Sequence, residues 1–126
     1  MPKTCVLLAE DNQDQRDLYT FVLKQAGFEV CQAEDGNSAL AELHRHRPDI
    51  LVTDVMMPGM NGIELIERIR NEEELHDLPI VVLSAYSDIL IKAHLKGATE
   101  IIQKPIDDVY GFVTTLLNIA DPHKEH

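Results

Sequence analysis

Short apolar runs alternate with amphipathic stretches along the whole chain. The apolar runs have the length and composition of buried strands, and we predict strands over residues 4–9, 28–33, 50–54, 80–83 and 99–103. Apolar side chains at helical spacing predict helices over residues 13–26, from the turn at 35–37 to Pro48, from Asn61 to the acidic run at 72–74, over 88–96, and across 109–117. Strand and helix therefore alternate five times.

Apolar stripes mark two of these predicted helices. In the first helix, Leu18, Phe21 and Val22 recur at helical spacing before Gly27 ends the segment. The last helix has apolar residues at positions i, i+3, i+4, i+7 and i+8, which predicts a stripe that faces the core. That stripe consists of Val109, Phe112, Val113, Leu116 and Leu117.

The alternation favours an α/β fold in which helices cover both faces of a parallel sheet and right-handed crossovers join the strands. No two predicted strands are close enough in the sequence to form a hairpin, which excludes most all-β folds. A length of 126 residues fits a single domain. We expect its core to cover about residues 4–119, with a frayed tail at 120–126.

The composition is that of a globular protein with an acidic surface. Hydrophobic residues make up 44% of the chain and charged residues 26%, and no apolar run is long enough to span a bilayer. With 22 acidic and 11 basic side chains, the formal charge is -11, so we expect no direct binding to nucleic acid or to anionic membranes. The N-terminus lacks a signal-peptide pattern, and we expect a cytoplasmic protein in which Cys5 and Cys31 are reduced core residues.

Reactive side chains stand at the ends of four of the predicted strands. The first strand ends on Glu10 and Asp11, the third on Asp54, the fourth on Ser84 and the fifth on Lys104. In an open parallel sheet, ligands bind beyond the carboxyl ends of the strands, where the strand order reverses. A strand order of 2-1-3-4-5 would place the first and third strands beside that point and would bring their three carboxylates together.

Three carboxylates at one place need a counter-charge, and a hard divalent cation such as Mg²⁺ supplies it. Lys104 and the Ser84 hydroxyl are suited to bind the outer oxygens of a phosphoryl group. An aspartate nucleophile, a metal and a phosphate-binding pair are the parts that phosphoryl transfer needs. Taken singly, each part has an ordinary alternative: a turn aspartate, a helix cap, a strand-end serine or a surface lysine.

These residues, in this order, resemble the receiver domain of bacterial two-component response regulators over about residues 4–119. The resemblance is carried by residues 8–12 (LAEDN), 54–62 (DVMMPGMNG), 83–85 (LSA), 97–98 (GA) and 104–105 (KP). It implies a flavodoxin-like (βα)5 fold, which is a doubly wound, five-stranded parallel sheet in the order 2-1-3-4-5. It also implies a phosphorylation-activated switch that is not an enzyme beyond its own phosphoryl transfer and autodephosphorylation.

The resemblance further implies a phosphoacceptor and a metal site. Asp54 would accept a phosphoryl group from a histidine kinase phosphohistidine or from a small phosphodonor. Mg²⁺, or Mn²⁺ in its place, would be bound by Asp11 and Asp54, by Glu10 largely through water, and by the backbone carbonyl of Met56. Lys104 would contact the phosphoryl group.

The switch that the family uses is only partly present. In the family, the hydroxyl of the fourth strand, here Ser84, turns toward the phosphoryl oxygen and draws the following loop of Ala85 and Tyr86 with it, while an aromatic residue on the fifth strand rotates inward. Ile101 stands where that aromatic residue is expected. We therefore expect the signal to pass through the Ser84 loop and the fourth helix to the face formed by the fourth helix, fifth strand and fifth helix. The alternative is an unusual output surface.

Three further residues carry expectations of their own. The peptide bond between Lys104 and Pro105 is expected to be cis, as in the family. Met56 and Tyr86 flank the expected approach of an attacking water and orient water poorly, which predicts a long-lived aspartyl phosphate. The alternative for both residues is that they merely line the loop.

The implied partners are a sensor histidine kinase or phosphotransfer protein upstream, and a protein target or a fused output domain downstream. The expected assembly is a monomer or a phosphorylation-dependent dimer. One alternative is an aspartyl phosphatase of the haloacid dehalogenase class, which expects a second Asp where Met56 stands. Another is a flavin-binding protein, whose phosphate cradle would be neutral where residues 10–14 are acidic (EDNQD). The last is a receiver that docks partners without phosphate, against which Asp54 and Lys104 argue.

Overall fold

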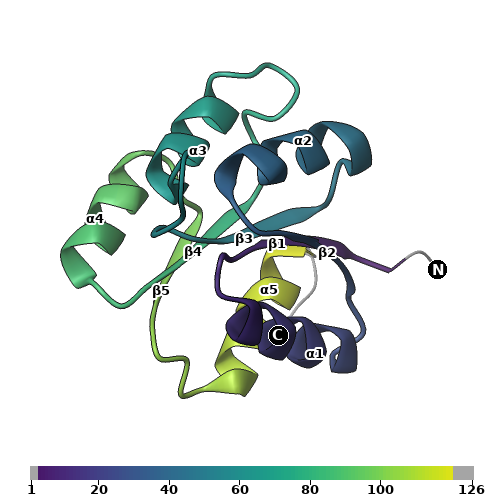
Figure 1. Cartoon of the computed structure of the whole chain (residues 1–126). Coiled ribbons are helices and arrows are strands. Elements are labelled where there is room, and N and C mark those ends of the chain that lie inside the picture. The colour runs from purple at the N-terminus through teal and green to yellow at the C-terminus, as the bar shows by residue number, and fades with distance from the viewer. Residues whose placement is uncertain (1–2, 121–126) are drawn as a thin grey trace.

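One parallel sheet with helices on both faces forms the molecule (Figure 1). The computed structural model describes residues 3–120, apart from the side chain of Leu95. The strands are β1 (Cys5–Ala9), β2 (Glu29–Ala33), β3 (Ile50–Asp54), β4 (Ile80–Ser84) and β5 (Glu100–Gln103). They pair in the order β2-β1-β3-β4-β5, which confirms the predicted doubly wound, flavodoxin-like topology.

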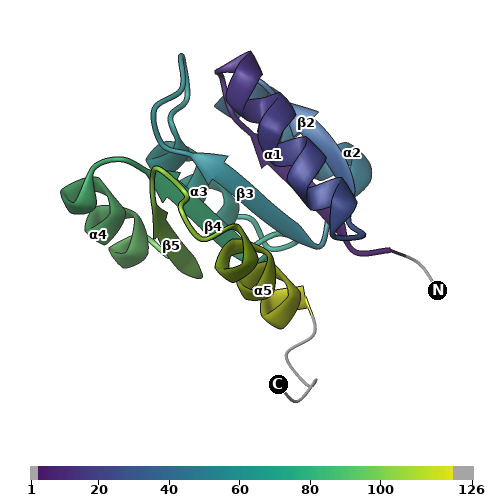
Figure 2. The ribbon, with the colours of Figure 1, turned by 90° about the horizontal axis from the view of Figure 1, so that it is seen from below.

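The helices fall into two layers. They are α1 (Gln13–Gln25), α2 (Gly36–His46), α3 (Gly62–Arg70), α4 (Ser87–Leu95) and α5 (Val109–Ala120). Helices α2, α3 and α4 cover one face of the sheet, and α1 and α5 cover the other, as Figures 1 and 2 show. Ala120, which was assigned to the predicted tail, is the last residue of α5, and residues 121–126 of that tail lie outside the described residues. No helix within residues 3–120 is both long and apolar enough to cross a membrane.

The central strands are buried on both faces because helices cover them from both sides. Every residue of β3 and of β4 is buried. One apolar layer lies between the sheet and α2, α3 and α4, and a second lies between the sheet and α1 and α5. This explains why these strands are continuous apolar runs and do not alternate with polar residues.

The register of the strands brings the carboxyl ends of β1, β3 and β4 to one edge of the sheet. Ala9 at the end of β1 lies beside Thr53 of β3, and Asp54 lies beside Leu83 of β4. The residues that follow these strands therefore meet at the same level. Local caps start the helices that leave this edge: the side chains of Asn12 and Asn61 accept hydrogen bonds from the backbone N–H groups of Gln15 and Glu64.

The predicted apolar stripe of α1 was wrong. Leu18 and Phe21 are 58% and 62% exposed, whereas Tyr19, Thr20 and Leu23 are buried. Thr20 is tolerated inside because its hydroxyl accepts a hydrogen bond of 2.7 Å from the side chain of Gln32 on β2. The helix is thus rotated by about one residue from the face that its aliphatic side chains suggest.

The predicted apolar stripe of α5 was only partly correct. Phe112 and Leu116 are buried, but Val109 and Leu117 are 45% and 44% exposed.

The expectation for the two cysteines was also only partly correct. Cys5 and Cys31 are free, as predicted, but only half-buried, with their sulfur atoms 3.9 Å apart. The register pairs Cys5 with Glu29 and Leu7 with Cys31, so the two cysteines are diagonal neighbours on adjacent strands.

Candidate phosphoacceptor and metal site

The acidic side chains that follow β1 and end β3 lie together, as the sequence predicts. Carboxylate oxygens of Glu10, Asp11 and Asp54 lie within 4.8 Å of one another. Glu10 and Asp54 are 1% and 8% exposed, while Asp11 is exposed to solvent. We call these three residues the carboxylate cluster. Its position beside the end of β3 is the point where the strand order reverses.

Asp54 is held at the end of β3 by the backbone that follows it. Its Oδ1 atom accepts hydrogen bonds from the N–H groups of Val55 at 2.7 Å and Met56 at 3.3 Å. Gly62 keeps this loop against the strand, because its N–H donates to Val55 O at 2.9 Å. A Cβ atom at position 62 would lie only 2.5 Å from Asp54 O, so no larger residue fits without a shift of the backbone.

Lys104 reaches into the carboxylate cluster from the end of β5. Its Nζ atom donates to Glu10 Oε1 and to Asp54 Oδ2, both at 2.8 Å. It also donates to Gln15 Oε1 on α1, at 2.7 Å. The predicted meeting of Lys104 with the strand-end acids is therefore confirmed, whereas the contact with Gln15 was not predicted.

The contacts of Lys104 shift the protonation equilibria of the buried groups. Burial raises the pKa of the Glu10 carboxyl above its ordinary value, and the hydrogen bond from Lys104 opposes this rise without cancelling it. Burial alone would lower the pKa of the Lys104 ammonium, but its hydrogen bonds to Asp54 and Glu10 outweigh burial, and the pKa is raised. The lysine therefore stays protonated at neutral pH and serves as the resident counter-charge of the cluster.

The donor set of the cluster fits a hard divalent cation. All three side chains offer carboxylate oxygens, which Mg²⁺ and Mn²⁺ prefer, and the exposed Asp11 leaves room for coordinated water. Glu10 Oε2 also accepts a hydrogen bond of 3.2 Å from the N–H group of Asn12, which helps to orient this carboxylate. The predicted role of the Met56 carbonyl as a ligand stays a prediction.

The loop after β4 starts from a buried hydroxyl. Ser84 is 1% exposed, and its Oγ atom accepts a hydrogen bond of 3.1 Å from the N–H group of Tyr86. Ala85 and Tyr86 are exposed, and the carbonyl of Ala85 accepts from the side chain of Gln103 at 3.4 Å. In this arrangement the Ser84 hydroxyl anchors the start of α4, and its predicted contact with a phosphoryl oxygen stays a prediction.

Two positions in and just after β5 bear on the expected switch. The peptide bond between Lys104 and Pro105 is cis, as expected. Ile101 is partly buried and packs against the apolar layer under α2, α3 and α4. An aliphatic side chain therefore fills the place where an aromatic ring was expected from the family resemblance.

Sequence reasoning missed two residues that contact Lys104. Besides Gln15, the ring of Tyr19 lies near the ammonium, with its centroid 5.9 Å from Nζ. Both residues lie on α1, one helical turn apart. The start of α1 immediately after the acid pair was the available signal, because it places the first turns of this helix beside the end of β1.

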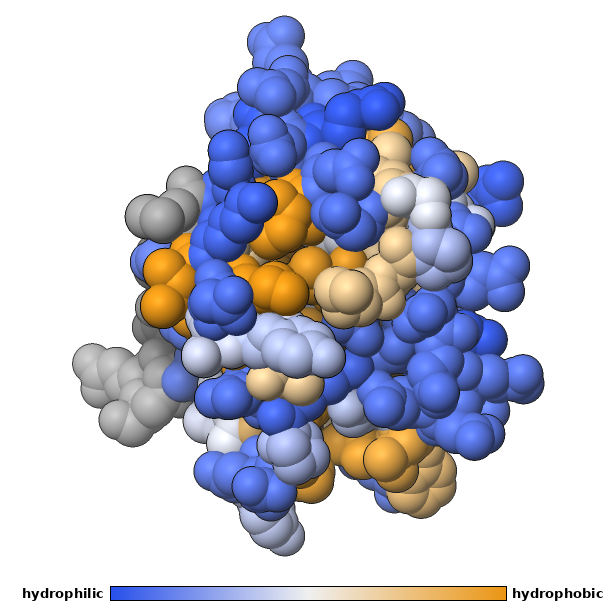
Figure 3. All heavy atoms as spheres, turned by 60° about the vertical axis from the view of Figure 1, so that its left-hand side comes forward, coloured by the Kyte–Doolittle hydropathy of each residue, from blue (hydrophilic) through white to orange (hydrophobic). Residues whose placement is uncertain are grey.

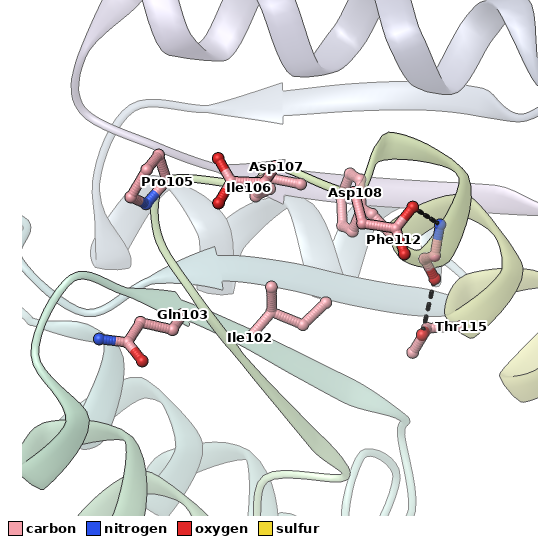
Figure 4. Close-up of a pocket in the computed structure, with 9 residues that line it drawn as sticks. Ile102, Gln103, Pro105, Ile106, Asp107, Asp108, Phe112 and Thr115 are labelled. Carbon is pink, nitrogen blue, oxygen red and sulfur yellow. Dashed lines mark hydrogen bonds between the residues drawn. The ribbon is translucent and has the colours of Figure 1, made fainter.

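A groove of about 400 Å³ between β5 and α5 is separate from this site. In Figure 4, Ile102 of β5 lies on one side and Phe112 and Thr115 of α5 lie on the other. Asp108 borders the groove and caps α5, since its Oδ1 atom accepts from the N–H group of Gly111 at 2.8 Å. The groove contains none of the carboxylates of the cluster, so we assign no phosphoryl chemistry to it.

The chain resembles known proteins in sequence and in structure. It is 35% identical to the phosphate regulon transcriptional regulatory protein PhoB of Escherichia coli over 102 residues, which are 79% of this chain and 44% of PhoB. A 14.6 kDa protein of Leptolyngbya boryana is 38% identical over 104 residues, which are 81% of this chain and 79% of that protein. The chain thus spans less than half the length of PhoB.

Among solved structures, the chemotaxis protein CheY4 of Vibrio cholerae superimposes with a TM-score of 0.85 and 29% identity, over 94% of this chain and 99% of that one. The sequence pattern of the response regulator receiver domain matches residues 6–110. This match covers most of the chain and includes the carboxylate cluster and Lys104. The chain therefore belongs to the response regulator receiver domain family of two-component signalling.

Proposed function

We propose that the chain is a single receiver domain in which Asp54 accepts a phosphoryl group from the phosphohistidine of a sensor histidine kinase or phosphotransfer protein. The observation that carries this proposal is the 2.8 Å contact between Lys104 Nζ and Asp54 Oδ2 within the carboxylate cluster. A nucleophilic carboxylate, acidic metal ligands and a protonated lysine at one place are the groups that phosphoryl transfer requires.

In this proposal, Glu10, Asp11, Asp54 and the Met56 carbonyl hold Mg²⁺, or Mn²⁺ in its place. The ion would neutralise negative charge between the phosphodonor and the carboxylates. Asp54 attacks phosphorus through a carboxylate oxygen, Lys104 contacts an outer phosphoryl oxygen, and the Ser84 hydroxyl turns from the Tyr86 N–H group to do the same. This turn would shift Ala85 and Tyr86 and so the start of α4.

We further propose that this shift changes the face formed by α4, β5 and α5, to which a downstream protein or a fused output domain binds. Figure 3 shows apolar side chains gathered on the side of α4 and β5 and surrounded by polar ones. Ile91 on α4 is 60% exposed, which supports a contact surface here. Because Ile101 is aliphatic, the proposed signal passes through the loop of Ser84 and does not involve a rotating ring on β5.

Intact-mass spectrometry after incubation with acetyl phosphate and Mg²⁺ tests the function. The wild type should gain one phosphoryl group, and Asp54→Ala should gain none. The matched control is Asp17→Ala, which removes an exposed carboxylate of α1 and should react as the wild type does. An adduct on Asp54→Ala would require another site, and no adduct on the wild type would favour a receiver that docks partners without phosphate. Turnover of p-nitrophenyl phosphate would favour the phosphatase alternative.

The lifetime of the product is a separate expectation. Met56 and Tyr86 each follow a site residue by two positions, and each is 57% exposed. Neither side chain is a good base for orienting water, so we expect phospho-Asp54 to persist. Rapid loss of the added mass at neutral pH in the presence of Mg²⁺ would contradict this expectation.

A further inference from the structure

The first two turns of α1 form a seat for the Lys104 ammonium. Gln15 and Tyr19 lie one turn apart on the same side of this helix. Lys104 Nζ donates to Gln15 Oε1 at 2.7 Å and lies 5.9 Å from the centroid of the Tyr19 ring. An ammonium group only donates hydrogen bonds, so the carboxamide oxygen of Gln15 must be the atom that faces it.

The seat leaves the ammonium without a free N–H group. A lysine has three N–H donors, and here Glu10, Asp54 and Gln15 each accept one. The lysine side chain is 13% exposed, so little water reaches it. A phosphoryl oxygen that binds Lys104 must therefore displace one of the three acceptors.

Gln15 is the acceptor that gives way most readily. Glu10 and Asp54 accept through carboxylates, so their bonds to the ammonium add the attraction between opposite charges to the hydrogen bond itself. Gln15 offers a neutral amide oxygen, so its bond to the lysine is the weakest of the three. It holds one N–H group in place until a stronger acceptor arrives.

Tyr19 supports the same arrangement from the buried side. Its ring lies within the range of a cation–π contact with Lys104 and also meets the ring of Phe112 on α5 edge-on, with centroids 6.2 Å apart and planes at 62°. Phe112 is 3% exposed, so this aromatic pair is fixed in the core. The flexible lysine chain is thereby confined before any ligand binds.

We propose that Gln15 and Tyr19 are positioning residues for phosphoryl capture. They hold the Lys104 ammonium where the phosphoryl group will arrive, and Gln15 yields its hydrogen bond to a phosphoryl oxygen. The inference rests on the proposed function of Asp54. In the test reaction the P–N bond of phosphoramidate breaks as a P–O bond to Asp54 forms, and the nitrogen, protonated before the bond breaks, leaves as ammonia.

The test for Gln15 is the rate of phosphorylation by phosphoramidate at saturating Mg²⁺, followed by intact mass. Gln15→Glu replaces the neutral acceptor with a carboxylate, which holds the Lys104 ammonium more strongly and repels the anionic phosphodonor. The rate of phosphorylation should therefore fall about tenfold or more. Gln15→Leu leaves the lysine less confined, and the rate should fall about threefold. Gln13→Glu is the matched control, because Gln13 is exposed in the same turn and gains the same charge.

The test for Tyr19 separates the ring from general packing. Tyr19→Phe keeps the ring and should stay within about twofold of the wild-type rate, whereas Tyr19→Leu removes it and should lower the rate about threefold. The Mg²⁺-induced shift in thermal midpoint should be the same in the wild type, Gln15→Leu and Tyr19→Leu. A variant that is merely misfolded would lose this shift together with its rate.

The outcomes distinguish the inference from the function on which it rests. No adduct on the wild type would overturn both. If the wild type is phosphorylated and Gln15→Glu and Tyr19→Leu are phosphorylated at the same rate as the wild type, the positioning role of Gln15 and Tyr19 is refuted. The phosphoacceptor role of Asp54 would then stand. If Gln13→Glu and Gln15→Glu slow phosphorylation equally, the cause is the added negative charge and not the contact with Lys104. This outcome would also refute the positioning role.

Discussion

Glu10 is a buried acidic residue whose carboxylate lies next to a second one. Glu10 is 1% exposed, yet its neighbours include the carboxylate of Asp54. Burial raises its pKa, and Lys104 is the cation that compensates its ionised form. The ionised carboxylate therefore contributes little to the stability of the protein without a metal ion.

Glu10→Gln should change how stability depends on pH. Because the pKa of Glu10 is raised in the folded state above its ordinary value of 4.5, its contribution is full below that pH and is lost as the pH rises through the folded pKa. A glutamine stays neutral and should not lose this contribution. The measurement is urea unfolding without divalent ions, repeated between about pH 4 and about pH 8. As the pH rises, the free energy of unfolding of the wild type should fall relative to that of the variant.

Glu64→Gln is the control for this comparison, since Glu64 is an exposed carboxylate in the first turn of α3. The free energy of unfolding of Glu64→Gln should depend on pH in the same way as that of the wild type. If the profiles of Glu10→Gln and the wild type were parallel over the whole interval, the raised pKa of Glu10 would be refuted.

Helix α1 shows that a helix can bury a face that its most apolar residues do not mark. Leu18 and Phe21 point to solvent, and Tyr19, Thr20 and Leu23 point inward. The inward face satisfies its polar atoms locally, through the bond between Thr20 and Gln32. Contacts with the sheet therefore set the rotation of the helix.

The two faces of α1 should respond differently to truncation. Leu23→Ala removes a fully buried side chain and should lower the free energy of unfolding by about 3 kcal/mol. Phe21→Ala removes a larger but 62% exposed side chain and should change it by less than about 1 kcal/mol. Urea unfolding of both variants measures the difference, and a larger loss in Phe21→Ala would mean that the helix is rotated toward the predicted stripe.

The strand pair β1 and β2 carries a testable chemical property in Cys5. Burial raises the pKa of its thiol to about 11, and the neighbouring Cys31 adds to the rise. Iodoacetamide should therefore alkylate Cys5 in the folded protein at least about tenfold more slowly at neutral pH than an unperturbed thiol, with a rate that climbs up to about pH 11. Mass mapping measures this rate. A plateau at a pH typical of free cysteine would contradict the assignment, and Cys31→Ser should speed the reaction.

The strands and the parts of the site that follow them could be predicted from sequence alone. A short apolar run such as Ile50–Asp54, bounded by Pro48 and by the loop at Pro58, favours a strand. Parallel strands end at a common edge, so Asp54, Glu10 and Lys104 could be expected to meet. The start of α1 directly after the acid pair indicates that its first turns lie near the site, but the choice of Gln15 and Tyr19 could not be predicted, because whether a helical side chain reaches the site depends on the rotation of the helix. Rotation follows from packing that the apolar pattern of α1 does not specify.

The molecule as a whole is acidic, with a formal charge of -11, and three of its carboxylates converge at one place. Self-repulsion of this kind weakens the folded state until cations bind. The carboxylate cluster is thus the place where a divalent ion should have the greatest effect on stability. The wild type at about 100 times the dissociation constant of Mg²⁺ should gain about 2.7 kcal/mol in free energy of unfolding.

Asp11→Asn should lose most of this gain, because it removes the exposed carboxylate of the cluster while leaving the buried core untouched. Asp14→Asn is the matched control: it neutralises an exposed aspartate in the first turn of α1 and should keep the full gain. Thermal or urea unfolding with and without Mg²⁺ measures both. An equal gain in Asp11→Asn and the wild type would place the metal elsewhere.

The bond between Lys104 and Glu10 joins residues 94 positions apart. On the proposed function, a chain emerging from the ribosome presents Glu10 and Asp54 long before Lys104, so it would accept no phosphoryl group until β5 has been translated and has paired with β4. Signalling competence would then appear only once synthesis has passed β5. An unfinished chain would give no response to a phosphodonor.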